Sequence, residues 1–358
     1  NNVGRFDHST DGQSAGTSRG ILIEGQSSNL ATYGSDLTNA AWNPLSAFIG
    51  GTAVGPDGTL SAVKLVASAA SGLYPRFRRL SLLTDTTQTF SIYVKPLEFQ
   101  HLAISADGSG SCLVQYNLSG SGAITSSTGA TGTVEQCGNG WFRVSFSYTT
   151  VPNAHLAITM QSSTTYQAET GNGYDGMLFA LAQLENQSFA SSFIGTTSST
   201  ATRAAESLSM TDSSLFDNGG GSLVVETENV GRAYYAAVLE DDSTSVYQDY
   251  VALTVRADNK ARQTVNAPGS TGASDEFSAA STVGGSYFKI ASRFAPNDFG
   301  VCIDGGTVST DTTGAVPSNV DKLFIGWYDD GGRANAHIKR VAVYGEALSD
   351  TNLQALTS

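Results

Sequence analysis

The stretch QTFSIYVKPL, residues 88–97, shows the pattern that decides the fold of this chain. Apolar Phe90, Ile92 and Val94 alternate in it with less apolar neighbours. Successive side chains of a β-strand point to opposite faces, so this spacing predicts a strand with one face in a hydrophobic core.

The same period of two recurs along the chain, with turns rich in small and polar residues between the stretches. Clear cases are TLSAVKLVAS (59–68), GWFRVSFSYTTV (140–151), AHLAITMQSS (154–163), GSLVVETENV (221–230) and SYFKIASRFA (286–295). A helical period is convincing only in residues 346–358, where Ser349 is a suitable N-cap. Strands that follow one another without helices pair antiparallel. We therefore predict an all-β fold: two tandem antiparallel β-sandwich (jelly-roll) domains with a short C-terminal helix.

A small, polar passage, GTTSSTATRAAESLSMTDSS (195–214), divides this pattern into two halves. We therefore predict one sandwich over residues 19–204 and a second over residues 205–358. Residues 1–18 are polar and rich in turn-forming side chains, so we expect them to form an N-terminal arm outside both domains.

The composition limits the classes of partner. The chain has 358 residues, with 19 Lys and Arg against 32 Asp and Glu, a formal net charge of −13. An acidic surface repels phosphate backbones, so we expect no nucleic-acid partner. No apolar run approaches the roughly 18 residues of a membrane span, so we expect no membrane insertion. Neutral glycans or proteins are better partners for such a surface.

The three cysteines make no disulfide framework. Cys112 and Cys302 lie beside apolar residues, which favours small buried core residues. A bridge between Cys112 and Cys137 is the alternative.

The first half of the chain carries a family resemblance. It contains RFDHSTDG and RGILIEGQSSNL near its start, and LAQLENQSFASSFIGTTSSTATRAA near its end. The order and spacing of these motifs over residues 4–210 resemble a unit found in bacteriophage tail-fibre and other host-contact virion proteins. That resemblance implies a jelly roll like that of a carbohydrate-binding module, and a place on the virion. It also implies assembly into a homo-oligomer, which in this family is typically a trimer.

The second half is similar to another superfamily. Its final stretch, KLFIGWYDDGGRANAHIKRVAVYGEALSDTNLQAL (322–356), resembles the last strands and helix of concanavalin-like, laminin-G-type sandwiches. The resemblance implies a lectin-like fold and gives little information about a ligand.

A carboxylate at the end of the first apolar run suggests a structural clasp. Glu24 closes that run, Glu185 lies near the last strand of the first unit, and Arg203 follows it. First and last strands are often neighbours in jelly rolls. We therefore hypothesise that Arg203 pairs with Glu24 or Glu185 and locks the exit peptide against the entry peptide.

The stretch YPRFRRLSLL places Tyr74, Arg76 and Arg78 on one face of a strand. The simpler interpretation is a solvated face of isolated cations. The functional one is a platform for an acidic sugar, in which the aromatic ring stacks on the sugar and the guanidinium groups hold carboxylates.

A second candidate ligand site is the loop that begins at Trp327-Tyr328-Asp329-Asp330, with Tyr234 near it. Aromatic and acidic side chains beside a Gly-Gly turn are suited to sugar binding. The alternative is that these aromatic residues pack in the core or at a sheet edge.

Acidic residues raise two further possibilities, catalysis and calcium. Glu226 and Glu228 face the same way on a strand, at a separation of about 7 Å that occurs in glycoside hydrolases. A third acid is absent, because Thr227 lies between them, so we favour a solvated strand face and expect no enzyme activity. The acidic clusters 240–242 and 329–330 offer oxygen ligands for a possible Ca2+, and the scattered histidines indicate no zinc site.

These observations favour a tail-fibre or spike protein of a virion that binds host surface polysaccharide without cleaving it, and that also contacts other virion proteins. One alternative is a structural capsid decoration or fibre protein that contacts only virion proteins. Another is a polysaccharide depolymerase.

Overall fold

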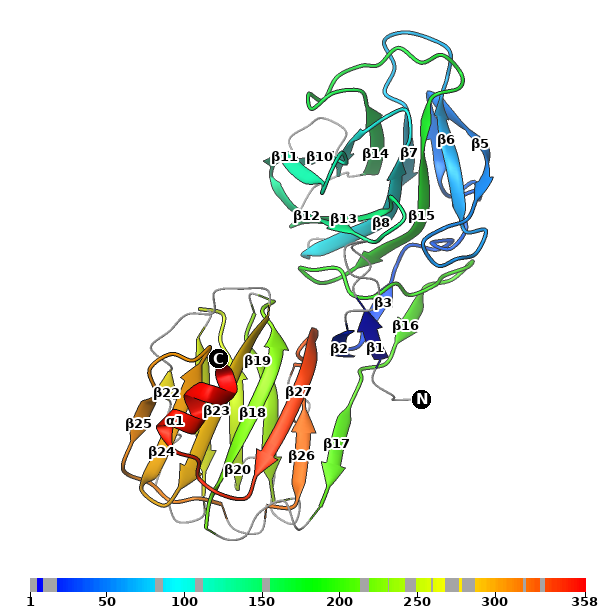
Figure 1. The fold of residues 1–358 in the computed structure, drawn as a ribbon. Helices are drawn as coiled ribbons and strands as arrows, with labels where there is room; N and C mark the ends of the chain where they lie inside the picture. Colours follow the sequence, from blue (N-terminus) through cyan, green and yellow to red (C-terminus); the bar gives the residue numbers. More distant parts are fainter. Residues whose placement is uncertain are drawn as a thin grey trace. The chain divides into compact units, whose positions relative to one another are not determined.

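The computed structural model describes residues 5–8, 18–80, 86–106, 112–149, 155–212, 219–230, 232–241, 249–258, 260–267, 277–278, 287–317, 320–328 and 332–358. They form two compact units (Figure 1). The central unit consists of residues 27–203, and the terminal unit is built from both ends of the chain, residues 5–8, 18–26 and 204–358. Both units are antiparallel β-structures, and one short helix ends the chain, so the predicted all-β class is confirmed.

The central unit packs two six-stranded antiparallel sheets face to face. The first, which we call the β14 sheet, has the order β11 (Ala123–Thr128), β10 (Leu113–Asn117), β9 (His101–Ser105), β14 (His155–Gln161), β7 (Arg76–Leu80) and β4 (Asn43–Leu45). The second, the β8 sheet, has the order β12 (Ala130–Gln136), β13 (Phe142–Tyr148), β8 (Gln88–Pro96), β15 (Gly176–Glu185), β6 (Ala62–Ala67) and β5 (Ala47–Ala53).

Every second residue of the strands points into the core between these two sheets. Phe90, Ile92 and Val94 of β8 are fully buried in it, as the sequence predicts. Trp42 is also completely buried, and its ring centroid lies 6.5 Å from that of Phe77 and 6.3 Å from that of Phe90. This aromatic contact joins the two sheets.

The chain enters and leaves the central unit through one small two-stranded sheet. The entry strand β3 (Ser27–Asn29) pairs antiparallel with the exit strand β16 (Ala201–Arg203), and Ser27 lies opposite Arg203. The backbone pairing therefore brings the two ends of this unit side by side.

Glu185 reinforces this junction from the last residue of β15. Its side chain is completely buried and accepts hydrogen bonds from Ser27 Oγ at 2.5 Å, from the backbone N–H of Ser191 at 2.9 Å and from Gln187 Nε2 at 2.9 Å. The carboxylate thus ties the entry strand to the segment that leads to β16. Buried carboxylates need such donors to offset their lost hydration.

Of the other two residues of the hypothesised clasp, Arg203 donates from Nη1 to the carbonyl oxygen of Ser192 at 3.3 Å. Glu24 belongs to the terminal unit, where its backbone N–H donates to Oε2 of Glu206 at 2.8 Å. The ion pair of Arg203 with either carboxylate stays a prediction.

We expect Glu185→Ala to lower the free energy of unfolding of the central unit by about 3 kcal/mol, because buried donors on two segments lose their acceptor. Thermal and urea unfolding followed by circular dichroism measure this loss. Glu185→Gln keeps one acceptor oxygen and should lose clearly less. Two variants with the same small effect would show that the carboxylate is not what secures the junction.

The terminal unit packs a seven-stranded sheet against a six-stranded sheet. The first, the β18 sheet, has the order β1 (Arg5–His8), β2 (Ser18–Ile23), β27 (Ala336–Tyr344), β18 (Gly221–Glu228), β23 (Tyr287–Ala295), β24 (Asp298–Ile303) and β25 (Ser309–Asp311). The second, the β19 sheet, has the order β17 (Leu208–Thr211), β26 (Lys322–Ile325), β19 (Tyr234–Glu240), β20 (Tyr250–Val255), β21 (Ala261–Asn266) and β22 (Phe277–Ser278).

The structure places the first strands differently from the predicted division at residues 18 and 204. β2 pairs with β27 of the terminal unit, with Ile21 opposite Ile338, and β1 in the predicted arm extends the same sheet. Gly20 fits this pairing, because a Cβ there would lie 2.4 Å from the carbonyl oxygen of Ile338. The physical reason is burial: Ile23 is completely buried beside the C-terminal strands.

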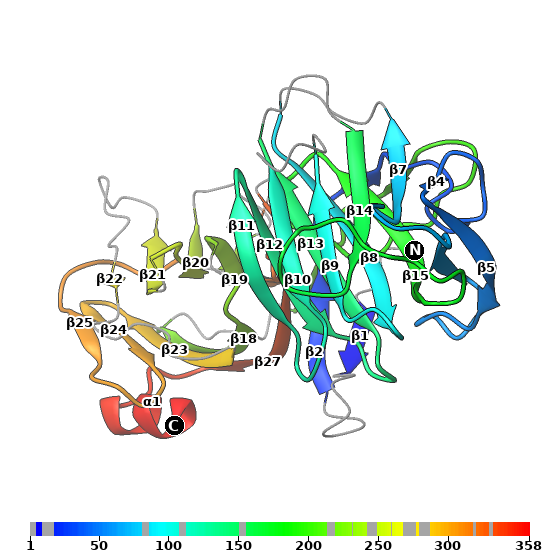
Figure 2. The same ribbon diagram turned by 90° about the horizontal axis from the view of Figure 1, so that it is seen from above.

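Helix α1 (Asp350–Thr357) covers the outer face of the β18 sheet (Figure 2). The side chain of Ser349 accepts a hydrogen bond from the backbone N–H of Asn352, so the predicted N-cap is confirmed. Arg293 of β23 holds the helix start: its Nε contacts Asp298 Oδ1 at 2.7 Å and its Nη1 contacts Asp350. Burial would lower the pKa of Arg293, but the hydrogen bonds that it donates to both carboxylates, together with their charges, outweigh burial and raise this pKa.

We expect Arg293→Lys to lower the free energy of unfolding of the terminal unit by about 1–3 kcal/mol, since an ammonium group cannot bridge both carboxylates. Differential scanning calorimetry checks this. Arg256→Lys is the matched control, because Arg256 meets Asp258 at 3.5 Å on the exposed surface. If both variants melted like the wild type, Arg293 would not be anchoring the helix.

Candidate functional site

The outer face of the β14 sheet is unusually well buried for a face turned away from the core. Leu156, Ile158 and Met160 of β14 point into the sandwich, so Ala157, Thr159 and Gln161 point away from it. These three outward residues are nevertheless 0 to 1% exposed. A sheet face turned away from the core is normally solvated, so this face is sunken.

The strand register arranges the outward side chains in three rows across the sheet. The first row contains Arg78, Ala157, Ser105 and Leu113; the second contains Arg76, Thr159, Ala103 and Gln115; the third contains Gln161, His101 and Asn117. The small alanines lie in the middle of the rows. Polar side chains therefore flank the two alanines, with two guanidinium groups on the β7 side.

Several polar atoms on this face lack a hydrogen-bond partner among the described residues. Ser105 and Thr159 are each 1% exposed, and neither hydroxyl has a partner. Three further buried nitrogens on the same face share this property, namely Nδ1 of His101 and Nε of Arg76 and of Arg78. Buried polar atoms are nearly always hydrogen-bonded in native proteins, so such a cluster needs an explanation. A ligand that supplies the missing hydrogen bonds is one.

The segment that follows β14 folds back over one end of this face. Gln115 donates from Nε2 to the carbonyl oxygen of Thr164, and Gln161 accepts from the backbone N–H of Gln167 at 2.8 Å. The ring of Tyr166 lies 5.2 Å from the ring of Tyr74. We call residues 162–169 the strap, since they cross from β10 to the start of β7.

The charges on this face are unevenly distributed. Within the described part of the chain, neither Arg76 nor Arg78 forms an ion pair, and Arg76 lies 5.9 Å from the ring centroid of Tyr74. Glu169 of the strap is buried and acts on His101. Burial lowers the pKa of His101, and the charge of Glu169 partly opposes that shift. The β7 side is therefore cationic, and the acid lies at the end where the strap closes.

The structure thus brings one predicted group together: Arg76 and Arg78 lie on the sunken face and Tyr74 lies at its edge. Sequence reasoning missed His101, Ser105 and Thr159. A signal for them was present, since HLAIS and HLAITMQ place polar residues at the positions that alternate with their core residues.

The second predicted group is largely structural. Tyr328 is 1% exposed and donates to Glu240 Oε1 at 2.6 Å, and Tyr234 is 4% exposed and donates to the carbonyl oxygen of Glu228 at 2.6 Å. Neither ring is accessible for stacking on a sugar. The ring carbons of both tyrosines pack against buried apolar residues of the β19 sheet, and this packing is the reason that the rings are buried.

Trp327 is partly buried and is also engaged with the protein. Its Nε1 donates to the carbonyl oxygen of Leu208 at 2.9 Å, its ring centroid lies 4.9 Å from that of Phe324, and Arg333 lies 4.6 Å above it. Asp329 and Asp330, the rest of the predicted loop, lie outside the described residues.

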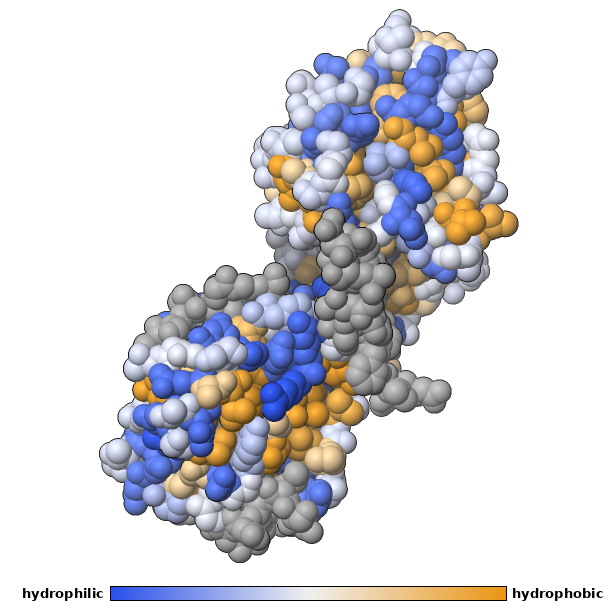
Figure 3. Space-filling view, in the orientation of Figure 1, coloured by the Kyte–Doolittle hydropathy of each residue, from blue (hydrophilic) through white to orange (hydrophobic). Residues whose placement is uncertain are grey.

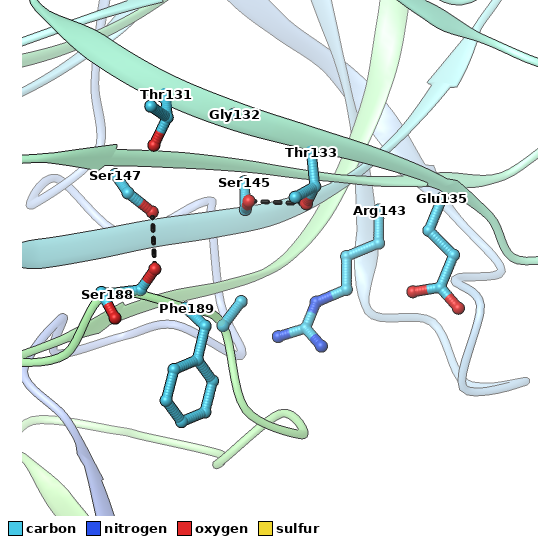
Figure 4. A pocket seen from close by; sticks show the side chains of 10 residues that line it. Thr131, Gly132, Thr133, Glu135, Arg143, Ser145, Ser147, Ser188 and Phe189 are labelled. Atoms are coloured by element: carbon cyan, nitrogen blue, oxygen red, sulfur yellow. Dashed lines mark hydrogen bonds between the residues drawn. The ribbon is translucent and has the colours of Figure 1, made fainter. Parts of the chain in front are cut away.

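A pocket of about 200 Å³ lies on the outer face of the β8 sheet (Figure 4). Two of its hydroxyl groups, those of Thr133 and Ser145, bind each other at 2.6 Å, and the Ser147 hydroxyl donates to the carbonyl oxygen of Ser188 at 3.4 Å. Arg143 points into it but donates to Ser91 Oγ at 3.0 Å and to the carbonyl oxygen of Ser191. This hydrogen bonding favours a structural role for the pocket.

The two acids considered for catalysis are engaged in ion pairs. Glu228 contacts Nδ1 of His337 at 2.6 Å and Arg19 at 3.2 Å, and Glu226 contacts Lys339 at 3.6 Å. Burial would raise the pKa of Glu228, but the hydrogen bonds and charge of His337, with the charge of Arg19, outweigh it and hold that pKa below its ordinary 4.5.

A lowered pKa means that Glu228 stabilises the fold fully above pH 4.5 and loses this contribution as the pH falls through its pKa. We therefore expect the wild type to lose stability on acidification below pH 4.5 more steeply than Glu228→Gln. Urea titrations at neutral pH and at a series of acidic values measure the difference. Glu226→Gln serves as the control. Parallel curves for wild type and Glu228→Gln would contradict the ion-pair assignment.

The described residues contain no group of three or more His, Cys, Asp or Glu side chains that could hold a metal ion. Asp242, Asp329 and Asp330 lie outside them, so the possible Ca2+ stays a prediction. All three cysteines are described, and none of them forms a disulfide. In the described part of the chain no helix is long and apolar enough to cross a membrane.

No family model and no curated protein matches this sequence. Among solved structures, the chain is similar to a carbohydrate-binding module of family 40 from the IT-sialidase of Ruminococcus gnavus, with 15% identity, a TM-score of 0.33, and coverage of 39% of this chain and 83% of that one.

Two further solved structures are similar to this chain. The SAP-like pentraxin of Limulus polyphemus has 13% identity, a TM-score of 0.31, and coverage of 39% and 70%. Domains LG4-5 of the mouse laminin alpha1 chain have 10% identity, a TM-score of 0.27, and coverage of 80% and 91%. These likenesses concern the fold alone.

Proposed function

We propose that this protein is a tail-fibre or spike component of a bacteriophage virion that binds host surface polysaccharide without cleaving it. The outer face of the β14 sheet is the proposed binding site. The virion assignment rests on the sequence resemblance over residues 4–210. The binding assignment rests on one observation, the buried polar atoms of this face that have no partner among the described residues.

Sugars match the chemistry of this face. A pyranose presents several hydroxyl groups, each able to donate and to accept, and it exposes apolar C–H faces to aromatic rings. Ser105 and Thr159 can hydrogen-bond such hydroxyls, and Tyr74 and Tyr166 form an aromatic edge beside them. Weak single sites become effective when several copies act together, which a homo-oligomer, a trimer in this proposal, would provide.

Exposed apolar side chains near β5 favour contacts with other virion proteins. The exposed fractions of Phe48, Val54 and Leu60, on and beside the edge strand β5, are 44%, 58% and 74%. Figure 3 shows hydrophobic residues among hydrophilic ones on the visible face of the central unit. Exposed apolar edges tend to find protein partners. A capsid decoration or fibre protein with no glycan ligand is therefore the second candidate.

We expect wild-type protein to bind polysaccharide on a glycan array, and Thr159→Val and Ser105→Ala each to weaken that binding about tenfold, a loss of one strong hydrogen bond. Both substitutions should also raise the melting temperature, because each removes a buried hydroxyl that has no partner among the described residues. Isothermal titration calorimetry and thermal unfolding measure the two effects.

Thr133→Val is the matched control on the β8 sheet. Its hydroxyl is bonded to Ser145 at 2.6 Å, so this variant should lose stability and keep its affinity. If the array stays blank, the glycan-binding proposal is wrong and the decoration protein is favoured. If a polysaccharide binds but Thr159→Val binds it equally well, the site lies elsewhere. Release of reducing ends from the polysaccharide would instead establish a depolymerase.

A further inference from the structure

We infer that the sugar bound on the outer face of the β14 sheet carries a carboxylate, and that Arg76 and Arg78 hold this group. The inference rests on the proposed function and names its ligand class. Arg76 and Arg78 alternate along β7, so they share one face with Cα atoms about 7 Å apart. Two cations at this spacing repel each other, and the described residues offer neither an ion-pair partner.

The overall charge makes this pair more significant. The chain has 32 acidic and 19 basic residues, so acids are plentiful, yet the described ones do not pair with these guanidinium groups. Both side chains are also partly buried, and their Nε atoms are inaccessible and lack a partner. Desolvated cations are costly unless an anion compensates them. A ligand anion fits this requirement.

The shape of the site favours a planar carboxylate. Each guanidinium is a rigid fork that matches the two oxygens of a carboxylate. Arg78 lies opposite Ala157 and Arg76 lies opposite Thr159, so the side chains beside the forks are small. The Thr159 hydroxyl can donate a further hydrogen bond to the same group. The adjacent ring of Tyr74 offers a surface for the sugar ring.

The charge distribution also sets the orientation of the ligand. Glu169 lies at the strap end of the face. Its backbone pairs with Leu73 just before β7, and its side chain accepts a hydrogen bond from the backbone N–H of Ser162 and acts on His101. A carboxylate would be repelled by Glu169 and attracted by Arg76 and Arg78. The acidic group of the sugar therefore lies at Arg76 and Arg78, away from the strap end of the face.

The test compares an acidic oligosaccharide with its carboxyl-reduced form, in which each carboxylate is a CH2OH group. A uronic-acid oligosaccharide and a sialylated oligosaccharide serve as probes, with a sulfated one as a third arm. We expect wild-type protein to bind a carboxylated probe roughly ten- to a hundredfold more tightly than its reduced form, as measured by isothermal titration calorimetry. Added salt should weaken only the binding of the charged forms.

Arg76→Lys and Arg78→Lys keep the charge and lose the fork, so each should weaken binding of the carboxylated probe at least tenfold and leave binding of the reduced probe unchanged. Arg143→Lys, on the β8 sheet, is the matched control and should bind both probes like the wild type. Thermal unfolding of each variant verifies that it folds.

The outcomes separate this inference from the proposed function. Equal affinity for the acidic and reduced forms overturns the carboxylate inference and leaves glycan binding intact. A preference for the sulfated probe that survives both lysine variants also overturns it, because a sulfate bound as a point charge does not need the fork. Absence of binding to every probe and to the whole array would overturn both.

Discussion

The proposed site depends on one constraint, the alternation of inward and outward side chains along the strands of the β14 sheet. Phe77, Ile104 and Ile158 must enter the core of the central unit, where all three are completely buried. Their neighbours Arg76 and Thr159 then have to face outward. A slip of one residue would bury a guanidinium in the sandwich and expose the core side chains, so packing enforces the register strongly. The same hydrophobic free energy that folds the domain therefore positions the polar rows.

The sunken face costs stability that other contacts must offset. Ser105 and Thr159 are buried without a partner among the described residues, and each such hydroxyl costs about 1–3 kcal/mol. Large compensating contributions come from the aromatic core around Trp42 and from the hydrogen bonds of Glu185. A polar face that weakens the free protein is expected where function requires preorganised donors. The pocket around Arg143 differs in that most of its polar groups are bonded within the protein, although Nε of Arg143 has no partner among the described residues.

Local patterns in the sequence predicted the all-β class, the N-cap at Ser349 and the shared face of Arg76 and Arg78, because each depends on residues close together in the chain. The prediction that β2 belongs to the first sandwich was wrong. Ile21 and Ile23 could complete the core of either sandwich, and only the pairing of β2 with β27 assigns them to the terminal unit. The sequence suggests Tyr328 as a ligand contact and cannot reveal its burial, because that burial depends on distant strands. The burial of Thr159 depends likewise on segments that fold over the sheet, which alternation cannot reveal.

The pairing of β3 with β16 also explains how a sheet can join strands more than 300 residues apart. Ile21 pairs with Ile338, so the terminal unit is complete only after the whole central unit has been made. The entropy of closing a flexible loop grows with its length. Once the central unit is folded, Ser27 and Arg203 lie opposite each other, and the long connection behaves as a short one. The junction that holds the central unit therefore lowers the entropic cost of forming the terminal one, and the buried carboxylate of Glu185 contributes to both folding steps.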